Sequence, residues 1–498
     1  MKDRFYIFST QKIKIFFAAL LLGISRLPLG LGFLVFFAFI PLFSYFEEEK
    51  NKKIITSAIL FSFVYTATCL HWISLVTLPG LIGIFIIFSV YYAIIFWILS
   101  KFWEKFHRFC YFLFIILWVS FEFGQNFTEF RFPWCNVGYS LAEYDVLLQV
   151  ADIGGIYLLS ILAILVNLIF YKIFTNSKMY IISLFMLLFL WVGYGMLRLE
   201  NLELEYTSKK ASIVQVSIKQ EQKWQPGFFS VTKNLYEEYT KKAVTRDVDL
   251  VIWPESAMTT YLLKRNSDLK FVKRIASENE IGIFTGFQDY EVAESDYPEK
   301  YKFYNACTLI DKNENVYPAY YKNFLVPFGE RMPLLDIFPF LWNIHLGQAN
   351  FEYGTRQKFY SWQNLKFSPF ICFEIVFPKK KKKMADKEID FIVNITNDAW
   401  FKRSVGTYQH AMMAKFRAIE TRKPVFRAAN TGYSMIVSPT GKIEQMTELY
   451  EKIILAAEII TLQKKTLYVR YFYLFPYFLL VISGVFIIFL LIKSFIFI

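Results

Sequence analysis

Apolar segments long enough to cross a lipid bilayer dominate both ends of this chain. A spanning helix needs roughly 20 residues for about 30 Å of hydrocarbon. Windows of this kind lie near residues 16–46 (two spans, separated by the turn from Pro28 to Gly32), 54–73, 81–99, 109–123, 146–171, 180–197 and 471–492. With 55% hydrophobic and 20% aromatic residues among 498, the chain is too apolar for an ordinary soluble protein. The sequence therefore predicts an α-helical membrane domain of about eight transmembrane helices.

Basic residues alternate in the connections between these spans and predict their orientation. They gather after spans two, four and six: Lys50, Lys52 and Lys53, then Lys101, Lys105 and Arg108, then Lys172 and Lys178. The intervening short connections hold only Arg26 and Arg131. By the positive-inside rule the N-terminus and the basic loops are cytoplasmic, and whatever follows the seventh span faces outward. In a bacterium with two membranes this predicts a multi-pass inner-membrane protein with a periplasmic domain.

The sequence predicts that the chain has three regions. Residues 1–200 form the transmembrane domain of about seven helices, residues 209–464 have ordinary globular composition, and residues 468–498 form a C-terminal transmembrane helix. In the globular region, short β-branched runs predict strands at 211–217, 248–253, 281–286, 304–310, 367–372, 390–396 and 433–437. Amphipathic patterns predict helices at 228–244, 269–279 and 407–421. Strands that alternate with helices indicate an α/β domain.

The charge distribution argues against a nucleic-acid partner, and the cysteine content argues against a fold held by disulfides. The net charge is +13, but the excess lies beside apolar segments, where it serves topology and lipid headgroups, so we expect no nucleic-acid partner. The five cysteines are odd in number and scattered, which argues against a disulfide framework. No glycine-rich phosphate loop, H-E-x-x-H or G-x-S-x-G motif is present in the sequence.

Three predicted strands end in polar residues with complementary chemistry. Glu255 follows one strand, Lys322 another and Cys372 a third, and strand ends are where α/β folds expose catalytic groups. A thiol must lose its proton to attack an acyl carbonyl. A carboxylate can accept that proton, and a cation stabilises the thiolate and the later oxyanion. Taken singly, such a cysteine is more often a small buried hydrophobe, and a lone Glu or Lys is usually on the surface.

Longer sequence strings connect these residues to a known family. They are Trp253-Pro254-Glu255, Tyr321-Lys322-Asn323-Phe324-Leu325-Val326-Pro327-Phe328-Gly329-Glu330, Cys372-Phe373-Glu374, Asn397-Asp398-Ala399-Trp400-Phe401, Gln409-His410, Arg417-Ala418-Ile419-Glu420, Phe132-Pro133-Trp134 and Gly138-Tyr139. The order Glu, Lys, Cys is similar to that of the nitrilase (carbon-nitrogen hydrolase) superfamily. Together the strings resemble the apolipoprotein N-acyltransferase family over essentially the whole chain.

The resemblance implies a nitrilase-like αββα sandwich with a Glu-Lys-Cys catalytic triad. Cys372 would be the nucleophile, Glu255 the general base and Lys322 the electrostatic stabiliser. In the family's ping-pong reaction, the cysteine takes a fatty acyl chain from a phospholipid as a thioester. It then passes the chain to the α-amino group of the N-terminal diacylglyceryl-cysteine of an apolipoprotein. Glu330 and Glu374 match further acidic positions of the family pocket.

Other matched positions carry smaller implications or depart from the family pattern. Trp224, in Lys223-Trp224-Gln225-Pro226, matches a substrate-side tryptophan. Phe373 stands where the family often has Tyr, so only its backbone N–H could serve an oxyanion, and Gln125 stands where a basic residue is common near Glu122. The resemblance implies no cofactor and no metal. The expected partners are membrane lipids, with a phospholipid as donor and a lipoprotein as acceptor, and we expect a monomer.

A few polar features admit two interpretations from sequence alone. Glu122 and His71 lie near span ends, where an ionisable group is either a functional site or solvated in the interface. The run from Lys379 to Lys383 attracts phospholipid headgroups or is a solvated loop, and the second is the commoner case. His410 lies far along the chain from other metal-ligand patterns, so a structural polar contact is favoured over a metal.

Two other functions are compatible with the sequence. The first is a membrane-tethered amidase of the nitrilase type that releases ammonia from small amides. The second is a transporter or assembly protein whose globular domain has lost its activity. The aromatic and acidic strings around Phe328 and Trp400 argue against the amidase, and the intact set of Glu255, Lys322 and Cys372 argues against lost activity.

Overall fold

The computed structural model divides the chain into two compact units. It describes residues 2–48, 53–106, 109–175, 178–295, 297–343, 350–378, 389–462 and 465–496. The membrane unit comprises Met1–Asn201 and Leu467–Ile498, and the α/β unit comprises Leu202–Thr466. The lysine run at 379–383 and the basic residues Lys50, Lys52 and Arg108 lie outside the described residues.

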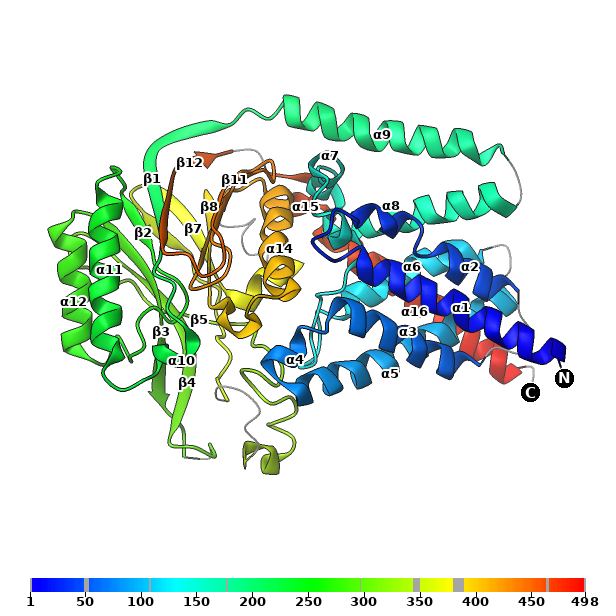
Figure 1. Cartoon of the computed structure of the whole chain (residues 1–498), viewed down its shortest axis with the longest axis horizontal. Helices are drawn as coiled ribbons and strands as arrows, with labels where there is room; N and C mark the ends of the chain where they lie inside the picture. Colours follow the sequence, from blue (N-terminus) through cyan, green and yellow to red (C-terminus); the bar gives the residue numbers. More distant parts are fainter. Residues whose placement is uncertain are drawn as a thin grey trace. The chain divides into compact units, whose positions relative to one another are not determined.

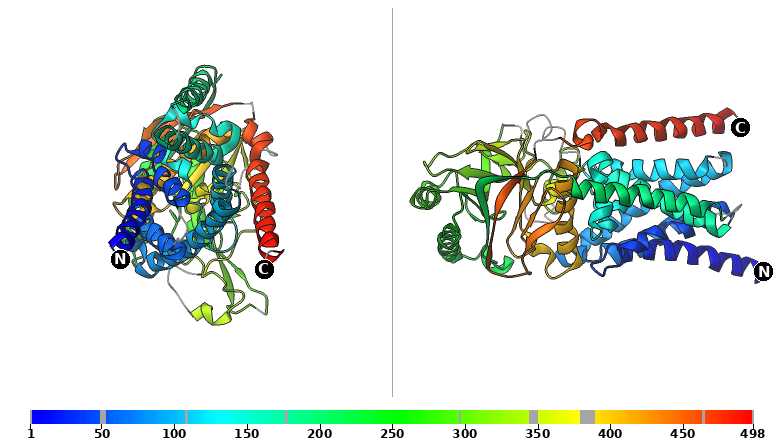
Figure 2. Two further views of the ribbon diagram at one scale, coloured as in Figure 1. Left: turned by 90° about the vertical axis from the view of Figure 1, so that its right-hand side faces the viewer. Right: turned by 90° about the horizontal axis from the view of Figure 1, so that it is seen from above.

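The membrane unit is built from helices. In chain order they are α1 (Lys2–Ile24), η1 (Gly32–Phe36), α2 (Ile40–Glu47), α3 (Ile54–Cys69), α4 (Ile73–Val76), α5 (Leu78–Lys105), α6 (Cys110–Gly124), η2 (Val137–Leu141), α7 (Asp145–Leu148), α8 (Ala151–Thr175), α9 (Tyr180–Glu200), α15 (Leu467–Arg470), η7 (Phe472–Leu474) and α16 (Phe475–Ile496). Within this unit α3 packs against α1 and α5, and α16 packs against α6 although they lie far apart in sequence (Figure 2).

The structure confirms the predicted transmembrane helices in part. Among the described residues, 4 helices are long and apolar enough to cross a membrane: α5, α8, α9 and α16. Shorter apolar helices occupy three more of the predicted windows, at Gly32–Glu47, Ile54–Cys69 and Cys110–Gly124. On α5, Ile86, Val90, Ile94 and Trp97 form a half-exposed stripe at helical spacing. A stripe of large apolar side chains on the surface is expected where a helix faces lipid.

The window predicted as one span at 146–171 is interrupted in the structure. A short helix, α7, precedes α8, and α8 itself contains a kink at Gly155, whose φ is 64° and ψ is −162°. A side chain at Gly155 would also meet the ring of Tyr468, because a Cβ there would lie 2.6 Å from it. Only glycine adopts this backbone and tolerates this approach. Hydropathy does not distinguish such a break from a continuous helix.

The α/β unit alternates strands with helices. Its elements are β1 (Glu205–Gln215), α10 (Gln220–Lys223), α11 (Phe228–Val244), β2 (Leu250–Ile252), α12 (Asn266–Glu278), β3 (Gly282–Val292), β4 (Tyr301–Ile310), β5 (Tyr320–Tyr321), η3 (Pro339–Asn343), β6 (Tyr360–Trp362), β7 (Leu365–Ile371), η4 (Cys372–Val376), β8 (Phe391–Thr396), η6 (Asp398–Phe401), α14 (Val405–Thr421), β9 (Val425–Ala429), β10 (Met435–Val437), β11 (Ile443–Met446) and β12 (Ile453–Thr461).

Two sheets of 6 strands face each other in this unit. Their strand orders are β12-β1-β2-β3-β4-β5 and β11-β10-β9-β8-β7-β6. The central strands β1, β2 and β3 are parallel, as are β7, β8 and β9. Parallel strands buried on both faces read as continuous apolar runs, as Leu250–Ile252 and Phe391–Thr396 do.

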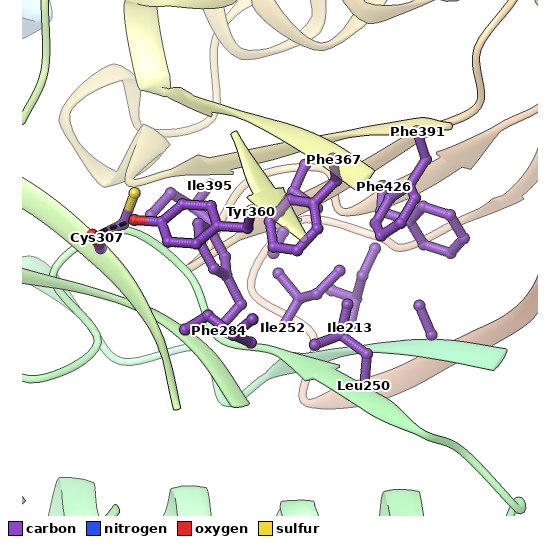
Figure 3. Close-up of a cluster of buried hydrophobic side chains, with 14 of the residues drawn as sticks. Ile213, Leu250, Ile252, Phe284, Cys307, Tyr360, Phe367, Phe391, Ile395 and Phe426 are labelled. Atoms are coloured by element: carbon purple, nitrogen blue, oxygen red, sulfur yellow. Dashed lines mark hydrogen bonds between the residues drawn. The ribbon is translucent and has the colours of Figure 1, made fainter. Parts of the chain in front are cut away.

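The hydrophobic core lies between the sheets and sets the layer order. Ile213, Ile252 and Phe284 of the first sheet meet Phe367 and Phe426 of the second (Figure 3). A second apolar cluster joins the other face of the first sheet to α11 and α12, while α14 packs on the second sheet (Figure 1). The predicted αββα sandwich is therefore confirmed. It brings the carboxyl ends of β2 and β7 to one region of the unit.

The predicted strands and helices of this unit correspond to observed elements with shifted ends. The seven predicted strands are β1, β2, β3, β4, β7, β8 and β10, and the three predicted helices are α11, α12 and α14. β5 was predicted only as the strand that ends before Lys322, without bounds. β6, β9, β11 and β12 were not predicted, and β6 has only 3 residues, too few to show a period.

Candidate active site

Cys372 begins η4 directly after β7, in a strained backbone conformation. Its φ is 50°, in the left-handed region that a non-glycine residue seldom adopts. Such strain persists only where surrounding contacts enforce it, and it is concentrated at functional sites. The neighbouring backbone N–H of Ile371 donates to Oε2 of Glu374 at 2.8 Å and helps to hold this turn.

Glu255 follows β2, and its carboxylate accepts hydrogen bonds from residues of two other chain segments. The side-chain amide of Asn305, in β4, donates to Oε1 at 2.7 Å. The backbone N–H of Asn397, after β8, donates to Oε2 at 2.7 Å. Because both oxygens accept a hydrogen bond, the carboxylate has a fixed orientation although it is buried.

Lys322 follows β5 and is fully buried between two carboxylates. Its Nζ lies 2.8 Å from both oxygens of Glu330 and 3.8 Å from Oε1 of Glu255. Asn305 also donates to Glu330, at 3.1 Å, so one amide connects the two acids. A buried ammonium between two carboxylates remains charged, because their attraction offsets the cost of burying the charge.

These contacts shift the proton affinities of the three predicted catalytic residues. Burial raises the pKa of the Cys372 thiol, Glu255 raises it further and Lys322 opposes both effects. Burial also raises the pKa of Glu255, with Lys322 opposing and Glu330 adding to the rise. Burial alone would lower the pKa of Lys322, but Glu330, Cys372 and Glu255 raise it above its ordinary value. Cys372 is therefore a neutral thiol at neutral pH and needs a base to become nucleophilic.

The remaining predicted site residues take different positions. Glu330 joins the cluster through Lys322. Glu374 is fully buried and accepts from the hydroxyl of Tyr320 at 2.6 Å and from the backbone N–H of Asn323 at 2.8 Å, so it ties the end of β5 to the Cys372 turn. Phe373 is buried. Trp224 is 45% exposed.

A polar network behind Cys372 contains His410, in agreement with the favoured prediction of a structural polar contact. One ring nitrogen lies 2.9 Å from Oδ1 of Asp398 and the other 3.2 Å from the carbonyl oxygen of Cys372. Asp398 also accepts from Arg427 at 2.7 Å and from Thr396 at 2.8 Å. The pKa of His410 is lowered by burial and by Arg427.

Three residues of this network could in principle bind a metal ion. A ligand atom of Cys372, one of Asp398 and one of His410 all lie within 4.8 Å of one another. Both carboxylate oxygens of Asp398 are already hydrogen-bonded, and the adjacent Arg427 guanidinium repels a cation. The arrangement therefore favours a hydrogen-bond network that supports the Cys372 turn.

The sequence gave no signal that Asn305 or Lys223 lies beside Glu255. Asn305 lies within a strand and resembles any polar residue there, whereas Asn397 belongs to the Asn397-Asp398-Ala399-Trp400-Phe401 string. Lys223 precedes Trp224 and donates to the backbone oxygen of Glu255 at 3.2 Å. Proximity to Glu255 across the fold identifies these residues, and local pattern does not.

The two ionisable residues near span ends differ in environment. Glu122 is buried, and its Oε1 accepts from the backbone N–H of Val137 at 2.8 Å, so it is not solvated in the interface. His71 is exposed and contacts the carbonyl of Thr68. The solvated interpretation holds for His71 alone.

Both units of the chain match known protein families. Residues 210–461 match the carbon-nitrogen hydrolase family, so the α/β unit is a carbon-nitrogen hydrolase domain. Residues 18–169 match the apolipoprotein N-acyltransferase N-terminal domain. The chain belongs to the apolipoprotein N-acyltransferase family, and it is a membrane-bound enzyme of the acyltransferase class.

Relatives named apolipoprotein N-acyltransferase match most of the chain. The protein of Geobacter metallireducens is 30% identical, over 91% of this chain and 90% of its own length. That of Rickettsia prowazekii is 32% identical, over 87% and 89%. Among solved structures, Nit3 of Saccharomyces cerevisiae, a member of the nitrilase superfamily, is 17% identical with a TM-score of 0.39, covering 50% of this chain and 89% of that one.

Proposed function

We propose that this enzyme transfers a fatty acyl chain from a phospholipid to the α-amino group of the N-terminal diacylglyceryl-cysteine of a lipoprotein, through a thioester on Cys372. The observation that carries this proposal is the cluster of Cys372, Glu255 and Lys322 in a chain whose membrane part matches the family's own N-terminal domain. The activity for which the relatives are named supports the lipoprotein acceptor.

The first half-reaction forms the thioester. Glu255 accepts the proton of the Cys372 thiol as the sulfur attacks the ester carbonyl of the phospholipid. Lys322 and the backbone N–H of Phe373 stabilise the oxyanion. When the ester C–O bond breaks, Glu255 returns the proton to the departing oxygen, and a lysophospholipid leaves.

The second half-reaction uses the same groups in reverse. The α-amino nitrogen of the acceptor attacks the thioester carbonyl and gives its proton to Glu255. The C–S bond breaks, an amide forms, and Glu255 returns the proton to the Cys372 sulfur. Protons and electron pairs balance over the cycle without a cofactor or metal.

The membrane unit suits this chemistry. Extracting an acyl chain from a bilayer costs about 0.8 kcal/mol per methylene, and an enzyme anchored in the same bilayer avoids most of that cost. We propose that the enzyme works as a monomer at the inner membrane, with Trp224 on the substrate side of the site and its α/β unit in the periplasm.

A fluorescent phospholipid tests the proposed function directly. Purified enzyme given this donor should carry one fatty acyl group on the peptide that contains Cys372, seen by mass spectrometry. Adding a diacylglyceryl-cysteine peptide should remove the adduct and yield the N-acylated peptide. Ammonia release from small amides without peptide acylation would favour the amidase instead.

Reporter fusions test the proposed orientation. Alkaline phosphatase fused after Thr466, the last residue of the α/β unit, should be active because it reaches the periplasm. The same reporter inserted after Lys53 should be inactive, because the basic loop stays in the cytoplasm. The reverse pattern would place the site on the side opposite to exported lipoproteins.

A further inference from the structure

Lys223 is a buried ammonium that the proposed mechanism does not use. It is the last residue of α10 and is 2% exposed. Its Nζ donates to the backbone oxygen of Glu255 at 3.2 Å, and no carboxylate in the described part of the chain forms an ion pair with it. Burying an ammonium without an ion-pair partner is costly, so a compensating interaction is expected.

The segment that carries Lys223 is attached to the active site. Oε1 of Gln220, in the same short helix, accepts from the side chain of Asn397 at 2.9 Å. The backbone N–H of Asn397 in turn donates to Oε2 of Glu255. Trp224, the next residue after Lys223, is the predicted substrate-side tryptophan. Lys223 is thus held at the proposed base through two routes.

The charges around Glu255 explain why a second cation is useful there. Glu255 and Glu330 contribute two negative charges, while Lys322 contributes one positive charge and lies closer to Glu330, at 2.8 Å, than to Glu255, at 3.8 Å. Lys223 makes the set of four groups neutral. Burial lowers the pKa of Lys223 to about 8, with Glu255 opposing the fall, and Lys223 in turn lowers the pKa of Glu255.

We propose that Lys223 is a positioning residue whose positive charge keeps Glu255 in the carboxylate form that accepts the proton of Cys372. This inference rests on the proposed function, because it assigns Lys223 a role through the proposed base. Lys322 also forms an ion pair with Glu330, and in the proposed mechanism it stabilises the oxyanion. Lys223 donates to the backbone oxygen of Glu255 itself.

The pH profile of acyl-enzyme formation tests this role. With a fluorescent phospholipid between pH 6 and 9, Lys223→Met should form the thioester about tenfold more slowly at the acid end, where Glu255 binds a proton more readily without the cation. At the alkaline end the rate should match the wild type, because Glu255 is ionised there in both proteins and Lys223 itself has lost its proton.

Three further variants separate charge from structure. Lys223→Gln keeps a donor for the Glu255 carbonyl but has no charge, and should behave like Lys223→Met; it carries the same test if Lys223→Met does not fold. Lys223→Arg keeps the charge and should stay near the wild-type profile. Lys219→Met, a loss of charge at an exposed lysine just before α10, is the matched control and should change nothing.

Each contrary result has a definite meaning. A uniform loss at every pH, an unchanged profile, or a normal profile in Lys223→Gln would overturn the electrostatic role. Failure of the wild type to form the Cys372 adduct would instead contradict the proposed function and this inference with it. Adduct formation with an unshifted Lys223→Met profile would remove this inference alone.

Discussion

Cys372→Ala is expected to abolish both the thioester and acyl transfer. The sulfur is the only atom in the proposed cycle that carries the acyl chain covalently, and alanine has no nucleophile. Cys372→Ser should lose nearly all activity, because a buried hydroxyl beside Glu255 is harder to ionise than a thiol. The measurement is the acyl adduct by mass spectrometry together with acylation of a diacylglyceryl-cysteine peptide.

The other cysteines provide matched controls for this result. Cys307 lies fully buried in the core between the two sheets, and Cys110 begins α6 in the membrane unit. Cys307→Ala and Cys110→Ala should each keep the Cys372 adduct and most of the transfer activity. Appreciable turnover in Cys372→Ala would rule out the covalent mechanism.

Lys322→Met is expected to reduce both activity and stability strongly. Loss of the cation removes an oxyanion contact, which typically costs about a hundredfold in rate, or about 3 kcal/mol. It also leaves Glu255 and Glu330 as buried carboxylates without their ammonium. Breaking a buried ion pair from one side typically costs 3–5 kcal/mol, on the order of a third or more of a domain's free energy of unfolding.

The destabilisation of Lys322→Met should depend on pH with a definite sign. Lys322 lowers the pKa of Glu255 against the larger effect of burial, so the variant raises that pKa further above its value in the unfolded chain. The folded variant then binds more protons than the unfolded one. Its stability deficit should therefore be largest near pH 8 and shrink as the pH falls toward 5. Thermal unfolding in detergent at both pH values measures this.

A double variant separates the two effects of Lys322. Lys322→Met/Glu330→Gln removes one carboxylate as well, so it should recover much of the stability while remaining inactive for lack of the oxyanion contact. Lys242→Met, which breaks an exposed ion pair with Glu238 on α11, should leave both quantities unchanged. Recovery of full activity in the double variant would contradict the role assigned to Lys322.

Much of the fold was predictable because it depends on local periodicity. The helix at 228–244 was predicted with both ends correct, since its amphipathic pattern is a local feature. Buried parallel strands such as β2 and β8 read directly as apolar runs. β6 was not predicted, because its 3 residues show no period.

The residues of the candidate site likewise fall into those that local sequence identified and those that only the fold brings together. Glu255, Lys322 and Cys372 were found because each lies at the end of a predicted strand, in a string that resembles the family. The sequence did not show which donors orient Glu255: Asn305 was not identified, and Asn397 was named only within a family string. The bond from Asn397 to Glu255 joins residues 142 positions apart, and nothing near Asn305 marks it as the amide between two acids.

The sequence by itself thus determined which residues are candidates for the proposed chemistry and which segments are apolar enough for a membrane, because side-chain type and local backbone period can be read along the chain. The tertiary structure decided which buried polar groups become neighbours. It placed Glu330 against Lys322, Lys223 against the backbone of Glu255 and His410 behind Cys372. These contacts depend on how two sheets pack face to face, and their distances set the electrostatics from which the proton affinities follow.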